Sequence, residues 1–111
     1  MDANNLVMVR GVVSSEPRLR ELPSGGVVTQ LDVTTRSGTL TTSVPIAIYD
    51  RPVDAAKGDE VIATGHINRR FFRAAGVTQS RTELVAADVV RVSRKRAVEK
   101  ALAAAADLLA G

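Results

Sequence analysis

The stretch Lys57-Gly58-Asp59-Glu60-Val61-Ile62-Ala63-Thr64-Gly65 decides how this chain folds. Its first four residues are a turn signal, and a strand follows over Glu60–Phe72 in which Val61 and Ala63 share one face. Gly65 interrupts that strand with a residue that has no side chain to pack, which is typical of a bulge or a sharp bend. The stretch therefore predicts a half-buried strand that bends at Gly65.

Four further segments have the composition or the alternation of β-strands. They are Leu6–Ser14, Val27–Arg36, Thr41–Tyr49 and Val77–Val92. The first contains Gly11, where we expect a second bend, and the last should present Val85, Ala87 and Val89 on one face. The chain is therefore predicted to contain five strands.

After the last strand, the spacing of apolar residues becomes helical, and one apolar stripe over Arg94–Leu109 predicts an amphipathic helix within residues 94–111. A short helical turn is also expected in Asp50–Lys57, between the third and fourth strands. This order suits an all-β fold, a five-stranded OB-fold Greek-key barrel over residues 1–93, followed by the C-terminal α-helix. From periodicity alone, an SH3-like barrel or a five-stranded sandwich fits the strand count nearly as well.

The composition excludes several classes of protein. With 111 residues, 45% hydrophobic and 24% charged, the chain forms one domain and is neither disordered nor a membrane protein. It has no Cys and one His, so disulfide scaffolds, zinc–thiolate sites and His-cluster metal sites are excluded. We expect no metal and no cofactor, and the absence of a Gly-rich phosphate loop or a credible acid–base pair argues against an enzyme. The start, Met1-Asp2-Ala3-Asn4-Asn5, is unlike a signal peptide, so a cytoplasmic protein is expected.

The charge is modestly basic and unevenly distributed. The net charge is +3, and twelve of the fifteen basic residues are Arg. Residues 1–55 carry five basic and six acidic groups, whereas residues 56–111 carry ten basic and six acidic groups. An Arg-rich basic half suits a phosphate-bearing partner, and the alternative is an ordinary solvated surface.

Several pieces of the sequence, in the same order, resemble the bacterial single-stranded DNA-binding protein (SSB) family. The matching pieces are Asn5–Val13, Glu16–Arg20, Pro23–Gly26, Val44–Tyr49, Lys57–Gly65, and finally Arg70, Phe72, Gly76 and Thr82–Val85. The resemblance covers residues 5–92 and implies an OB-fold that holds a single strand in a basic channel and stacks its bases on aromatic rings.

The resemblance assigns Tyr49 and Phe72 to stacking positions of the family. Strand alternation agrees, because it places both rings opposite the apolar faces of their strands and directs Phe71 inward. Basic groups interleaved with an aromatic ring are typical of nucleic-acid surfaces. The predicted nucleic-acid-binding residues are therefore Tyr49, Phe72, Arg69, Arg70, Arg73, Arg10 and Arg36.

Two departures from the family pattern affect the functional prediction. Ser43 stands where the family commonly has Trp, and the family's long second hairpin, which carries another Trp, shrinks to Ser37-Gly38-Thr39-Leu40. The chain also lacks the flexible acidic tail of the family and ends in an Ala/Leu helix, so it resembles a divergent short member. Losing two stacking platforms predicts weaker binding that depends more on phosphate contacts and on salt.

The predicted function is non-sequence-specific binding of single-stranded DNA in replication, recombination or repair, by a homo-oligomer (dimer or tetramer) without membrane contact. Replication or repair proteins would be its further partners. One alternative is an SSB-derived protein-interaction or structural module that works through the C-terminal helix. Another is a primosome-type accessory protein with the same barrel. The sequence leaves open whether the helix docks on its own barrel or on a partner.

Overall fold

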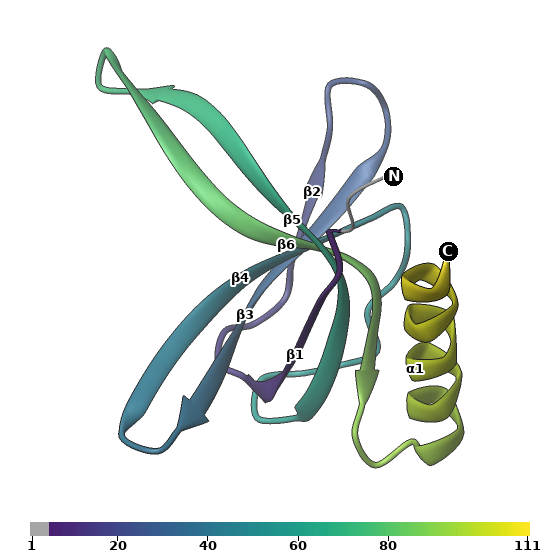
Figure 1. Ribbon diagram of the computed structural model, residues 1–111. Helices are drawn as coiled ribbons and strands as arrows, with labels where there is room; N and C mark the ends of the chain where they lie inside the picture. Colours follow the sequence, from purple (N-terminus) through teal and green to yellow (C-terminus); the bar gives the residue numbers. More distant parts are fainter. Residues whose placement is uncertain (1–4) are drawn as a thin grey trace.

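The computed structural model describes residues 5–111. The predicted domain 1–93 and the N-terminal stretch that is unlike a signal peptide both include residues 1–4. These four residues lie outside the described residues. The elements, in chain order, are β1 (Val7–Val13), β2 (Arg18–Glu21), β3 (Val27–Ser37), β4 (Leu40–Tyr49), β5 (Glu60–Ala74), β6 (Val77–Arg91) and α1 (Lys95–Ala110). Figure 1 shows the strands crossing one another at the centre of the molecule, with α1 at one side.

Five of these strands close into a barrel. They are hydrogen-bonded in the order β1-β5-β6-β4-β3, and a further pairing of β1 with β3 closes the ring. The β4–β6 pair is parallel and the other pairs are antiparallel. The predicted five-stranded OB-fold barrel with a C-terminal helix is therefore confirmed. Strand β2, which the sequence pattern did not predict, adds a short edge to β3.

The barrel core consists of small aliphatic side chains from every barrel strand. Leu31, Val33, Ile46, Val61 and Leu84 are almost completely buried. The predicted alternation is confirmed in β3, β4 and the first half of β5, because residues two apart along each strand reach the same core. Since no ring is part of this core, the aromatic side chains lie at its edge or outside it.

The bend expected at Gly65 is a β-bulge. Gly65 lies opposite Ala86 and Thr64 lies opposite Asp88, so Ala87 is an extra residue in β6. The strands approach so closely here that a Cβ on Gly65 would lie 1.9 Å from the carbonyl oxygen of Val85. Only glycine fits this position without moving the backbone of β6.

The bulge also shifts the side-chain pattern of β6. The expectation that Val85, Ala87 and Val89 share the core face was wrong, because Leu84 and Ala86 are in the core before the bulge and Val89 packs against it afterwards. One extra residue reverses the alternation, since successive side chains of a strand point to opposite faces. The bulged carbonyl of Ala87 accepts a hydrogen bond from Arg51.

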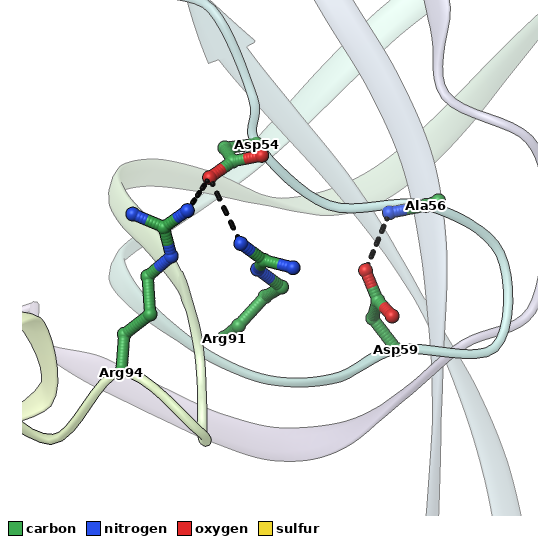
Figure 2. Close-up of polar contacts among 5 residues, drawn as sticks. All are labelled: Asp54, Ala56, Asp59, Arg91 and Arg94. Atoms are coloured by element: carbon green, nitrogen blue, oxygen red, sulfur yellow. Dashed lines mark hydrogen bonds and ion pairs between the residues drawn. The ribbon is translucent and has the colours of Figure 1, made fainter.

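The segment between β4 and β5 contains no helix, so the helical turn expected in Asp50–Lys57 is not formed. Asp50 has a left-handed φ of 54°, and Pro52 has no N–H to donate. Alternate side chains of this extended segment, Val53 and Ala55, pack against the core instead. The segment is closed by Asp59, whose carboxylate accepts a hydrogen bond of 2.9 Å from the N–H of Ala56 (Figure 2).

Asp54 connects this extended segment to the start of the helix. One of its carboxylate oxygens lies 2.7 Å from Nη2 of Arg94 and 3.3 Å from Nη2 of Arg91, as Figure 2 shows. Arg94 is the N-cap residue of α1 and makes no side-chain cap. The carboxylate therefore offsets positive charge at a helix end where the macrodipole disfavours it.

Helix α1 docks on its own barrel. It packs against β6 and β5 through Ala101 and Ala105, which are buried, while Leu102, Leu108 and Leu109 remain exposed. Short alanine side chains allow the helix to lie close to the sheet. In the part of the chain that the structure describes, no helix has the length and apolar character to cross a membrane.

The close approach at Gly65 generates a test of stability. The Gly65→Ala variant should lower the free energy of unfolding by about 1–3 kcal/mol, because the added methyl group meets backbone that cannot turn away. Urea denaturation measures this change. Thr82→Ala, at an exposed position of the same strand pair, serves as the control and should change stability by less than about 0.5 kcal/mol. Equal stabilities of Gly65→Ala and the wild type would contradict the close approach.

Candidate nucleic-acid interface

Beyond the barrel, β5 and β6 continue as a two-stranded hairpin arm, residues 68–83 (Figure 1). Pairing of β6 with β4 is confined to Leu84 and Val85, so among the described strands only β5 pairs with β6 along the arm. The arm is therefore a ribbon with two free faces. Alternation assigns each of its side chains to one face or the other.

One face of the arm carries Phe72 together with two arginines. Phe72 lies opposite Gln79, and Arg70 lies opposite Arg81, in the antiparallel register. The Arg70 guanidinium carbon is 5.7 Å from the centre of the Phe72 ring, which is a cation–π distance. The ring is 38% exposed, so it keeps surface on which a base could stack.

This face of the arm continues onto β3 and β4. Nη2 of Arg81 lies 3.9 Å from Oδ1 of Asp32 on β3, which joins the two surfaces. Val28, Asp32 and Arg36 are separated by even numbers of residues on β3, so they share one face of that strand. Tyr49 of β4 lies opposite Val28 and therefore points to the same face of the sheet. We call this the front surface, and it is defined by Arg36, Tyr49, Arg70, Phe72 and Arg81.

The front surface is long, and its two rings are far apart. Ala47 pairs with Val85 in the parallel β4–β6 pair, so Tyr49, two residues further on, is level with Ala87 of β6. Phe72 pairs with Gln79 of β6. The distance along β6 between these two levels is roughly 25 Å, at about 3.3 Å per residue. The two rings therefore cannot hold the same base, although both lie within the reach of one strand that covers the barrel.

Two arginines occupy opposite strand positions at the centre of the front surface. Arg70 and Arg81 are directly opposite across the strand pair, and Nε of Arg70 is buried without a partner among the described residues. Glu83 and Asp32 lie beside them, and Glu83 is only 3% exposed. Like charges in directly opposite positions are unfavourable, and a buried N–H without a partner adds to that cost. The carboxylates of Asp32 and Glu83 offset part of this positive charge, and an anionic ligand beside the two arginines would offset more of it.

The other predicted site residues lie elsewhere. Arg69 and Arg73 are on the opposite face of the arm, and Arg10 is on the barrel exterior, where its Nε lies 3.2 Å from Glu60. The structure therefore brings only Arg70 and Phe72 together at close range. Figure 1 shows that the β3–β4 hairpin, whose strand β3 includes Arg36, and the arm extend in different directions.

The expectation that Phe71 packs inward was wrong. Phe71 does point to the same side as Ile67, but it is 66% exposed, because the core ends before the strand reaches it. Alternation predicts the face of the strand on which Phe71 lies, but it does not predict where along the strand the core ends. Ser43 lies on the front face, two positions from the residue that pairs with Asp32, and it is exposed.

Within residues 5–111, no group of three His, Cys, Asp or Glu side chains could hold a metal ion. His66, the single histidine, is exposed and lies opposite Val85 at the base of the arm.

Comparison with known proteins identifies the fold. No protein-family model and no curated protein sequence matches the chain. Among solved structures, the chain is similar to an SSB of Plasmodium falciparum in complex with ssDNA, with a TM-score of 0.72 and 20% sequence identity. The match covers 83% of this chain and 97% of the other. At this identity the likeness establishes the barrel, and it agrees with the strand order described above.

The facing arginines should make stability depend on salt. Added salt screens the repulsion between Arg70 and Arg81. The free energy of unfolding of the wild type should therefore rise with salt by about 0.2–1 kcal/mol more than that of the Arg70→Gln variant. Urea denaturation at low salt and at about 0.5 M salt measures the difference. Arg36→Gln is the matched control, since Arg36 faces Thr41 rather than a cation. The same salt response in both variants would contradict the repulsion.

Proposed function

We propose that this protein binds single-stranded DNA without sequence specificity and is not an enzyme. The observation that carries the proposal is the Phe72 ring, 38% exposed, with Arg70 at a cation–π distance and Arg81 in the strand position opposite Arg70. A phosphate can accept hydrogen bonds from the two arginines, and the adjacent ring offers a surface for the neighbouring base. The likeness to an SSB in complex with ssDNA supports the same assignment.

In this proposal the strand lies along the front surface. Arg70, Arg81 and Arg36 contact phosphates, while Phe72 and Tyr49 stack bases near the two ends of the surface. Neither contact type reads the identity of a base, so sequence tolerance follows. With few rings available, phosphate contacts supply a large share of the affinity, and binding should weaken steeply with salt.

The wider role belongs to the same proposal. We infer an SSB-like protein that acts in DNA replication, recombination or repair in the cytoplasm, and that assembles as a dimer or tetramer. Exposed apolar side chains on β1, Met8 and Val12, are compatible with assembly. The alternative of a module that works through α1 loses support, because the helix docks on its own barrel through Ala101 and Ala105.

The direct test uses the intrinsic fluorescence of Tyr49. The chain has one Tyr and no Trp, so its near-ultraviolet emission reports Tyr49 at one end of the front surface. Titration with oligothymidylate at low salt should quench that emission. Phe72→Leu should weaken binding by about 5- to 150-fold, which is the effect of about 1–3 kcal/mol for one stacked base.

The matched control for Phe72→Leu is Leu109→Ala, an exposed apolar position on α1 that should leave affinity unchanged. No binding at micromolar protein and low salt would reject the proposed function. Binding that Phe72→Leu leaves intact would reject the stacking role of Phe72 alone.

The ion pair between Arg81 and Asp32 generates a second test. The pair is partly exposed and worth at most about 1 kcal/mol, and DNA must compete with it for Arg81. Asp32→Asn should therefore raise affinity by up to about fivefold. Asp107→Asn on α1 is the control, and an unchanged affinity in Asp32→Asn would exclude Arg81 from the interface.

A further inference from the structure

The face of the hairpin arm opposite the front surface has the same kinds of side chains as the front. We call it the back surface, and its members come alternately from β5 and β6. They are Arg69, Phe71, Arg73, Thr78, Ser80 and Thr82, all of them exposed. Because these side chains are exposed, no element within the described residues covers this part of the arm.

Phe71 and Arg69 form a pair like that of Phe72 and Arg70. The Arg69 guanidinium carbon lies 5.7 Å from the centre of the Phe71 ring, and Nε of Arg69 donates to Oγ of Ser80 at 3.3 Å. These contacts hold the guanidinium in place while its outer N–H groups remain exposed. Phe71 is 66% exposed, against 38% for Phe72, so the back surface presents the more accessible ring.

The charge of the back surface favours an anionic partner more clearly than the charge of the front. Arg69 and Arg73 are accompanied by three hydroxyl groups and by no carboxylate on this face. On the front surface, by contrast, Asp32 and Glu83 lie beside the arginines. Hydroxyl and guanidinium donors next to an exposed ring suit the phosphates and bases of a single strand.

We propose that the hairpin arm binds single-stranded DNA on both faces, with one strand passing over the front surface, around the arm and onto the back surface. There Phe71 stacks a base, Arg69 and Arg73 contact phosphates, and the hydroxyls of β6 donate to the backbone. The arm has only two strands, and no third described strand pairs with either of its edges, so a flexible single strand can pass around it. This inference rests on the proposed function and extends its binding site.

The test compares oligothymidylates that contain 5-iododeoxyuridine, at lengths of about 5 and about 20 nucleotides, chosen around the usual span of one OB-fold. Phe71→Leu should weaken binding of the long oligomer by at least about fivefold and of the short one by much less, since a short strand cannot occupy both surfaces. Irradiation of the long complex should cross-link Phe71 as well as Phe72. Leu108→Ala on α1, which is 64% exposed, is the control of similar exposure.

Each failure has a distinct meaning. If Phe72→Leu weakens binding while Phe71→Leu has no effect at either length and no cross-link forms at Phe71, the two-faced arm is wrong and the proposed function stands. If no oligomer binds, the proposed function itself is wrong. If Phe71→Leu lowers the mass of the assembly in sedimentation and leaves affinity per protomer unchanged, the back surface contacts a second copy of the chain, and the inference is overturned.

Discussion

The close approach of β5 and β6 at Gly65 is the constraint on which the rest of the structure depends. Because Gly65 has no side chain, the backbone of β6 can approach and accommodate Ala87 as an extra residue. On one side of the bulge β5 pairs with β1, and on the other side β6 pairs with β4 at Leu84 and Val85 before the two strands continue as the free arm. The barrel contacts and the arm thus belong to one strand pair, and the bulge lies between the two contacts that join this pair to the rest of the barrel.

Much of the fold could be predicted from alternation and turns, because alternate residues of β3 and β4, namely Leu31, Val33, Ile46 and Ile48, line one core. Prediction failed where the pattern depends on an interaction between distant segments. The bulge at Ala87 shifts the alternation of β6 through its contact with Gly65, which the local sequence of β6 does not show. The helical turn expected after β4 is replaced by extended chain, because Val53 and Ala55 reach the core that way.

The candidate site was predicted in its residue types and only partly in its arrangement. Alternation correctly placed Tyr49 and Phe72 away from the core, and it also implied that Phe71 turned towards the core. Where the core ends is a property of the whole barrel, so the exposure of Phe71 could not be read from its strand. Arg69 and Arg73 were predicted to share a site with Arg70 because they are close to it in sequence. In the two-stranded arm, however, Arg70 is on one face and Arg69 and Arg73 are on the other.

The arm also differs from the barrel in what stabilises it. Its order depends on the backbone ladder between β5 and β6 and on side chains that are largely exposed, and a two-stranded hairpin in water is only marginally stable. The free energy needed to open it locally is therefore well below that needed to unfold the barrel. A ligand that packed against both faces would bury side chains that the free arm exposes, and binding would then raise the free energy needed to open the arm.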